Sequence, residues 1–232
     1  MFVFLLACIA SFIPSIVLFY WFRGLKQEDQ VYHNLCNEAM KKGLLSVLPV
    51  ILISGGSNLL IILIGFHKLH PLLYQMIYNF IVLALAEETV KYLTFQTIVK
   101  KNDYPYSWTD AVVLMSTVGT GFGLIESVAF FITSNVPSVL IKGISIPHAG
   151  YGFIIGYFYG KGLKTGKKSE KWIGFVITWL IHGLYDFSLS EEFIALNEYL
   201  MLVAIALAVL DFVLLIGLIV FVKRHTAKSE AV

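Results

Sequence analysis

The sequence has little charge and almost no cysteine, and both shortages restrict what the protein can be. Only 14% of its 232 residues are charged, whereas a soluble domain carries about 25%. The two cysteines, Cys8 and Cys36, are too few for a disulfide framework or a thiolate metal site. Polar segments are also short, and no soluble domain or long linker is visible. The function must therefore lie within the apolar part of the chain.

Long apolar runs dominate what is present. Hydrophobic residues make up 58% of the chain, and the mean hydropathy is +0.79. A helix needs about 20 apolar residues to cross a hydrocarbon core of ~30 Å. The runs are continuous and do not alternate, which favours helices over a barrel. The sequence thus predicts a single integral membrane domain, 1–232, an all-α bundle of about seven transmembrane helices. They lie near residues 2–22, 43–66, 72–99, 110–134, 137–160, 171–190 and 193–222.

Lysine and arginine gather in alternate loops, and this pattern predicts the orientation. Most of the 17 basic residues lie within 23–42, 100–101, 161–171 and 223–228. Cytoplasmic loops collect Lys and Arg, so we expect the N-terminus outside and the C-terminus in the cytoplasm. The first window has no positive residue before it and is followed by Arg23 and Lys26, which predicts a retained anchor, not a cleaved signal peptide. Topology explains these cations, so no nucleic-acid partner is indicated. The lipid bilayer of a bacterial cell (inner) membrane, crossed several times, fits this pattern.

Three charges interrupt the window at 72–99. Glu87, Glu88 and Lys91 are its only charged residues, and each charge costs about 2.5–3.5 kcal/mol at the centre of a membrane helix. Residues three or four apart share a helix face, so Lys91 neighbours both glutamates, whereas the two glutamates diverge. We expect one carboxylate to be catalytic and the other to pair with Lys91 or orient a partner helix. A purely structural ion pair is the alternative.

The later windows carry further polar residues. Glu126 has no basic neighbour on its own helix, and His148 precedes three glycines at four-residue spacing that are typical of a packing seam. His182 and Asp186 are four residues apart, a spacing at which a carboxylate can orient an imidazole. Each has a structural alternative: a protonated carboxyl between helices, a histidine bonded to a backbone carbonyl, a solvated aspartate. At about 1.5 Å per residue, all can lie at similar depths. We therefore predict that four helices contribute to one pocket.

The four constellations together resemble the motifs of the PrsW family of intramembrane proteases. They match EExxK, FxxxE, HxxxG and HxxxD, in family order, within a core at 72–190. CAAX-prenyl endoproteases are more distantly similar; they carry His or Arg where this chain has Glu126 or Lys91, which argues against processing of prenylated proteins. The resemblance implies cleavage of a membrane-anchored protein, in the best-known case site-1 cleavage of an anti-sigma factor during envelope stress. It implies these catalytic residues: Glu87, Glu88, Lys91, Glu126, His148, His182 and Asp186.

Hydrolysis without a nucleophilic serine or cysteine needs an activated water, a stabilised oxyanion and a proton for the amine. We expect Glu87 or Glu88 to be the base, assisted by His148, with His182 at the oxyanion and Glu126 sharing a proton or positioning the water. The chain has no HExxH and no helix with two histidines one turn apart. This favours a glutamic-type enzyme without a cofactor.

Two alternatives stay open. In a zinc-dependent variant, the ligands would be Glu87, Glu126, His148 and His182. A proton- or ion-coupled transporter or channel also places carboxylates and histidines at membrane depth. Such proteins often contain inverted repeats, and none is evident here. A structural subunit without catalysis would leave these polar residues unexplained.

Overall fold

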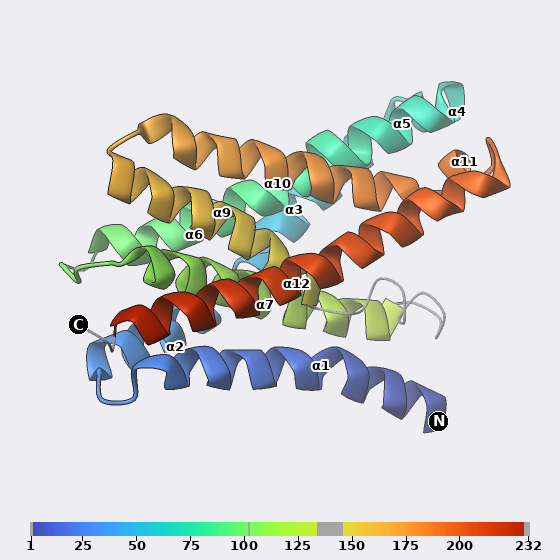
Figure 1. Cartoon of the computed structure of the whole chain (residues 1–232). Helices are drawn as coiled ribbons and strands as arrows, with labels where there is room; N and C mark the ends of the chain where they lie inside the picture. The colour runs from blue at the N-terminus through green and yellow to red at the C-terminus, as the bar shows by residue number, and fades with distance from the viewer. Residues whose placement is uncertain (1, 102, 134–145, 230–232) are drawn as a thin grey trace.

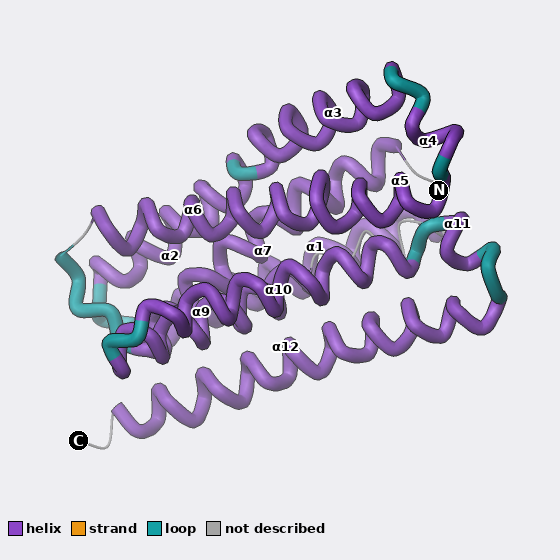
Figure 2. Tube along the Cα trace, turned by 90° about the horizontal axis from the view of Figure 1, so that it is seen from above, coloured by secondary structure: helices purple, strands orange, loops and turns teal. Residues whose placement is uncertain are grey.

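The computed structural model describes residues 2–101, 103–133 and 146–229, and all regular structure within these ranges is helical. The predicted all-α class is confirmed. Most long helices run along one common direction (Figure 1), and α3 and α12 lie at opposite edges when the bundle is seen from above (Figure 2). The long helices are α1 (Phe2–Arg23), α2 (Gln30–Leu45), α3 (Val47–Leu63), α6 (Leu85–Lys101), α7 (Trp108–Thr133), α9 (Ile146–Thr165), α10 (Lys168–Ser188) and α12 (Met201–Ser229).

Each of the seven predicted windows contains one of these helices, but some limits differ. The window at 193–222 begins with the short helices α11 (Glu191–Ile194) and η3 (Glu198–Leu200), and α12 starts only at Met201. Residues 137–145 of the fifth window lie outside the described residues. Within the described part, three helical stretches are long and apolar enough to cross a membrane: Gln30–Leu63, Trp108–Ala129 and Met201–Thr226. The count of seven and the orientation stay predictions.

The segment after the first window is a helix, not the loop that was expected. Asp29 caps α2 by accepting a hydrogen bond from the backbone N–H of Tyr32 at 2.9 Å. Its buried residues follow a helical period, Tyr32, Leu35, Cys36, Ala39 and Gly43. This face packs along α7. The charges of α2 lie on the other face, which is why the segment seems polar in the sequence.

Helix α7 is the centre of the bundle and packs most extensively against α9 and α2. Glycines bring these backbones together. A Cβ on Gly152 would lie 2.6 Å from the carbonyl oxygen of Met115, and one on Gly156 would lie 2.7 Å from that of Ala111. Any larger residue would force the helices apart. The predicted packing seam is confirmed, and it holds α9 and α7 in register.

The window at 72–99 is not one regular helix. It contains α5 (Pro71–Ile77), a π-helical segment η2 (Tyr78–Ala84) and then α6. The Phe80 carbonyl accepts the backbone N–H of Leu85 and also the indole N–H of Trp179 at 2.6 Å, so α10 is bonded directly to the irregular segment. π segments occur often at functional sites. This one ends just before Glu87.

An ionic cluster joins the ends of α1, α2 and α7 near the basic loops. Lys26 lies 2.7 Å from Asp110, and the Tyr104 hydroxyl donates to Asp29 at 2.8 Å. Asp110 also accepts from the backbone N–H of Ser107 at 2.9 Å, which caps α7. The backbone N–H of Tyr32 holds the pKa of Asp29 below its usual range, and the Tyr104 hydroxyl acts in the same direction. We call Lys26, Asp29, Tyr104 and Asp110 the terminal cluster.

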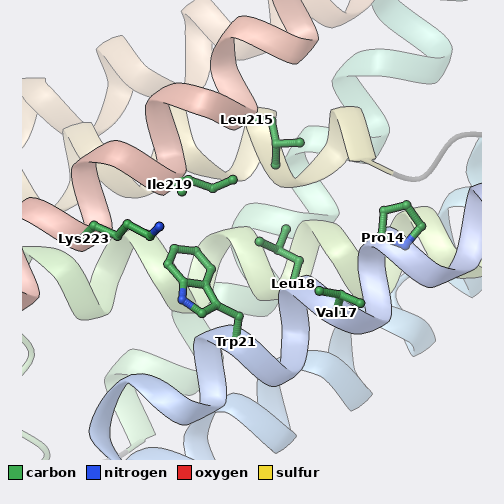
Figure 3. A pocket seen from close by; sticks show the side chains of 7 residues that line it. All are labelled: Pro14, Val17, Leu18, Trp21, Leu215, Ile219 and Lys223. Carbon is green, nitrogen blue, oxygen red and sulfur yellow. The ribbon is translucent and has the colours of Figure 1, made fainter.

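A groove of about 370 Å³ separates α1 from α12 (Figure 3). Its walls are apolar, and the Lys223 side chain at one end extends toward Trp21. Its full lining is Pro14, Val17, Leu18, Trp21, Leu215, Ile219 and Lys223. None of these residues belongs to the predicted polar site, which lies elsewhere in the bundle.

Candidate active site

The predicted polar residues converge between four helices. Helix α6 contributes two glutamates and a lysine, α7 one glutamate, α9 one histidine, and α10 a histidine and an aspartate. The seam between α7 and α9 accounts for part of this convergence, because a Cβ on Gly119 would lie only 2.1 Å from the carbonyl oxygen of His148. We call the seven residues the polar core: Glu87, Glu88, Lys91, Glu126, His148, His182 and Asp186. The predicted convergence is observed, while the catalytic roles remain predictions.

Lys91 lies at the middle of the polar core. Its ammonium group donates to Glu88 Oε1 at 2.6 Å and to Glu87 Oε2 at 3.4 Å. It also lies 3.2 Å from His148 Nδ1 and 4.4 Å from the centre of the Phe122 ring. The side chain of Lys91 is only 1% exposed. One cation therefore connects both glutamates of α6 with the histidine of α9, as the helical spacing predicted for the two glutamates.

His182 faces carboxylates on both sides of its ring. Its Nδ1 lies 2.7 Å from Glu88 Oε1. Its Nε2 lies 3.3 Å from Asp186 and 3.8 Å from Glu87. Acceptors at both nitrogens favour a ring that carries both protons. The expected contact with Asp186 is present, and the shorter contact with Glu88 adds a second, unexpected orienting group.

The partners of His148 assign its tautomer. The Lys91 ammonium can only donate, so Nδ1 of His148 must accept. Nε2 then carries the proton and donates it to Glu126 in a short hydrogen bond. Glu126 thus finds its partner on another helix, one of the options that the sequence left open. The pair forms a unit that can pass a proton from α9 to α7.

The polar core contains more negative than positive groups. Four carboxylates face Lys91 and a doubly protonated His182, and an uncompensated buried charge is strongly unfavourable. Solvent relieves part of this imbalance, because the side chains of Glu126 and Asp186 are 24% and 19% exposed. Glu87 and Glu88 are 3% and 0% exposed. Lys91 and the doubly protonated His182 balance this buried pair, so the excess negative charge lies on the two partly exposed carboxylates.

Four side chains have the chemistry and spacing to hold a metal ion. Within the described part of the chain, one donor atom from each lies within 4.8 Å of the others: Glu87, Glu88, His148 and His182. Two imidazoles and two carboxylates suit Zn²⁺, and Glu88 Oε2 is buried with no hydrogen bond to any described residue. The residues therefore fit a metal. The set differs from the expected one in containing Glu88 instead of Glu126, because Glu126 binds the outer edge of His148.

Two residues of this region were missed. The ring of Tyr151 stacks on His182 with centroids 4.8 Å apart, and it meets His148 edge-on at 5.9 Å. Asp211, in α12, is buried within electrostatic range of Tyr151 and His182. A signal was available for Asp211, since it is the sole charge between Met201 and Val222. Tyr151 offered none, because a tyrosine in an apolar helix is unremarkable.

Comparison with known proteins gives one consistent result. The family described as "PrsW family intramembrane metalloprotease" matches residues 38–216, a range that includes the whole polar core. The chain is 30% identical to Protease PrsW of Oceanobacillus iheyensis over 116 residues, 48% of this chain and 54% of the relative. It is 27% identical to Protease PrsW of Bacillus subtilis over 118 residues, 48% and 54% of the two chains.

The match to Protease PrsW of Clostridioides difficile is longer: 26% identity over 193 residues, 79% of each chain. Otherwise the chain spans about half the length of the curated relatives it matches first. No solved structure matches significantly.

Proposed function

Because the chain belongs to the PrsW family, we propose that it is an intramembrane protease that hydrolyses a peptide bond of a membrane-anchored protein. The observation that carries this proposal is the convergence of carboxylates and imidazoles from four helices in one cluster around the buried Lys91. We also propose that the chain is a multi-pass protein of a bacterial cell membrane, a location that its long apolar helices and its bacterial relatives support. In this proposal the chain has seven spans, with its N-terminus outside and its C-terminus in the cytoplasm.

The geometry supports different roles for the two adjacent glutamates. Glu88 is held tightly, with short contacts of 2.6 Å to Lys91 and 2.7 Å to His182. Glu87 has only longer contacts, 3.4 Å to Lys91 and 3.8 Å to His182. A general base must be free to take a proton from water. We therefore assign the base to Glu87 and the anchoring of Lys91 and His182 to Glu88.

The remaining groups serve the other needs of hydrolysis. Glu87 takes a proton as water attacks the carbonyl carbon, and His182 Nε2–H donates to the oxyanion that forms. When the C–N bond breaks, the leaving amine takes the proton that Glu87 removed from the water, which returns Glu87 to its carboxylate form, while the His148–Glu126 pair positions the water. Glu126 and Asp186, the partly exposed members, border the side from which substrate and water enter.

A metal-dependent form of this mechanism has support from the donor set. Glu87, Glu88, His148 and His182 would hold the ion. The ion would act as a Lewis acid and lower the pKa of the attacking water. In the glutamic form, which we favour, Lys91 supplies the positive charge between the same groups. Exhaustive chelation distinguishes the two: cleavage that survives it supports the glutamic form, and cleavage lost and then restored by Zn²⁺ supports the metal form.

The substrate is proposed from the family alone. We expect a protein with a single membrane span, in the best-known case an anti-sigma factor whose first cut leads to release of a sigma factor. Mass spectrometry of membrane-protein fragments in cells with wild-type protein or Glu87→Gln tests this. Fragments that appear only with the wild type identify the client and its scissile bond. An identical fragment pattern in both would contradict the protease.

A proton- or ion-coupled transporter is the competing function. It also uses buried carboxylates and histidines. Proteoliposomes separate the two functions, because a transporter moves protons or ions across the vesicle membrane and leaves a single-span reporter intact. A protease cleaves the reporter without a flux.

A further inference from the structure

Asp211 is a buried carboxylate that the proposed mechanism does not use. It lies in the middle of α12 and is 4% exposed. Neither of its oxygens makes a hydrogen bond to any residue in the described ranges. Helix α12 packs against α9 at this point, where a Cβ on Gly150 would lie 3.7 Å from the Asp211 carbonyl oxygen. The carboxylate therefore faces the bundle and not the lipid.

A second unpaired polar group lies beside it. The Tyr151 side chain is 1% exposed, and its hydroxyl makes no hydrogen bond within the described part of the chain. The carboxylate of Asp211 faces the Tyr151 hydroxyl closely enough to interact with it, without a hydrogen bond of normal geometry, and it lies within electrostatic range of His182 and Asp186. The Tyr151 ring stacks on His182 at 4.8 Å. Three polar atoms, two on Asp211 and one on Tyr151, are thus buried directly behind the polar core.

Such atoms in a native protein are generally satisfied by ordered water when no protein group serves them. Water suits this pair, because it can donate to the carboxylate and accept from the phenol at the same time. Lipid chains offer neither donor nor acceptor. Hydrolysis consumes one water molecule for every bond cut, and a site surrounded by lipid must obtain that water through the protein.

We propose that Asp211 and Tyr151 bind ordered water between α9 and α12 and that this water supplies the polar core. The binding of water depends only on these two side chains. Its use in hydrolysis rests on the proposed function. The supply passes the His182 side of the core, since the Tyr151 ring lies against His182 and Asp186 is the exposed member of the same helix.

X-ray radiolytic footprinting of the full chain in nanodiscs tests the water site without any assay of activity. Radiolysis of bound water oxidises neighbouring side chains, even buried ones, and mass spectrometry locates the product. We expect oxidation of Tyr151. Tyr32 is a matched control, since it is also 1% exposed but donates its hydroxyl to the Phe22 carbonyl at 3.0 Å. Oxidation of Tyr151 no greater than that of Tyr32 would overturn the proposal.

Variants of α12 then connect the water to Asp211. Asp211→Leu should reduce the oxidation of Tyr151 to the level of Tyr32. Val213→Leu, at an exposed position of the same helix, should leave it unchanged. Unaltered oxidation in Asp211→Leu would mean that the water is held by other groups, which contradicts the assignment. Because the wild-type comparison with Tyr32 needs no variant, the water site stays testable even if Asp211→Leu does not fold.

Cleavage of a single-span reporter tests the supply. Asp211→Leu should lower kcat about tenfold, the usual effect of removing a supporting group behind a site, with KM little changed. Asp211→Asn, which keeps an acceptor, should recover much of the loss. An unchanged kcat in Asp211→Leu would overturn the supply role. If the wild type cleaves nothing, the proposed function fails, while footprinting still decides the water site.

Discussion

Two ionic clusters in this bundle differ in how completely their charges are satisfied. In the terminal cluster, Lys26 pairs with Asp110, and Asp29 accepts from the Tyr32 N–H and the Tyr104 hydroxyl. Each carboxylate there has a partner and also caps a helix. In the polar core, four carboxylates share one lysine and two imidazoles, and Glu87, the proposed base, has only the longer contacts of 3.4 Å to Lys91 and 3.8 Å to His182. The paired charges of the terminal cluster hold helix ends together, whereas the less completely paired carboxylates of the polar core can take part in catalysis.

Removal of the central cation should have the largest effect. Lys91→Met leaves Glu87 and Glu88 buried without their ammonium partner, and breaking a buried ion pair typically costs about 3–5 kcal/mol of unfolding free energy. We expect a large fall in the thermal midpoint in detergent and no cleavage. The double variant Lys91→Met/Glu88→Gln should recover part of the stability but none of the activity. If Lys91→Met alone keeps wild-type stability, Lys91 does not balance the glutamates.

Substitution of a glycine in the seam between α7 and α9 should reduce cleavage nearly as strongly. Gly119→Leu would place side-chain atoms against the His148 carbonyl, which a Cβ alone would approach at 2.1 Å. Overpacking costs about 1–3 kcal/mol, and a displacement of about 1 Å in a catalytic group can lower the rate about 100-fold. Gly156→Leu crowds the same seam away from the polar core. Reporter cleavage per folded molecule should fall much more in Gly119→Leu than in Gly156→Leu; equal losses would refute a local effect on His148.

A substitution in the terminal cluster should lower stability and leave cleavage unchanged. Lys26→Met removes the partner of the buried Asp110, and an unsatisfied buried acceptor costs about 1–3 kcal/mol. Thermal unfolding should therefore shift downward while kcat/KM for the reporter stays within twofold or so of the wild type. A loss of cleavage as large as that of Lys91→Met would show that the two clusters are not functionally distinct.

The smallest expected effect is on stability at low pH, through the carboxylate of Asp29. The pKa of Asp29 is held below its usual range by the Tyr32 N–H, so its stabilising contribution is present above the ordinary aspartate pKa of about 3.9 and is lost as the pH falls through the lower folded value. Asp29→Ala should cost about 1 kcal/mol at neutral pH by removing the cap of α2. Asp29→Asn keeps a cap but does not titrate, so its stability should depend less on pH below about 4. Identical acid unfolding curves for wild type and Asp29→Asn would contradict this.

The sequence predicted those features that depend on local spacing. The helical period predicted that Lys91 lies beside Glu87 and Glu88 and that His182 lies beside Asp186. The spacing of the glycines in α9 predicted a close contact with another helix. That the four motif segments meet was inferred from depth and from resemblance to a family, and the structure brings them together. The sequence did not predict which residues make contact between helices. The contact of Lys91 with His148, that of Glu126 with the same ring and that of Glu88 with His182 appear only in the structure. These depend on how helices rotate and pack.

The other features that the sequence analysis missed also depend on how the helices pack. Helix α2 was mistaken for a loop because its buried face is spread over a segment rich in polar residues. The π-helical turn before Glu87 could not be predicted from local spacing, and Trp179, far away in the chain, adds a second hydrogen bond to the Phe80 carbonyl beside that from the Leu85 N–H. Tyr151 matters only because α10 places His182 against its ring.

Reconstitution of the purified protein in lipid vesicles tests whether the polar core hydrolyses peptide bonds. Purified wild type and Glu87→Gln are placed in proteoliposomes with a fluorogenic single-span reporter, and initial rates of cleavage are measured at equal amounts of folded protein. We expect cleavage by the wild type and a loss of about 10²–10⁴-fold in Glu87→Gln, the range typical of a general base, with similar unfolding temperatures for the two proteins. Equal cleavage by the two proteins would contradict a hydrolytic site in the polar core.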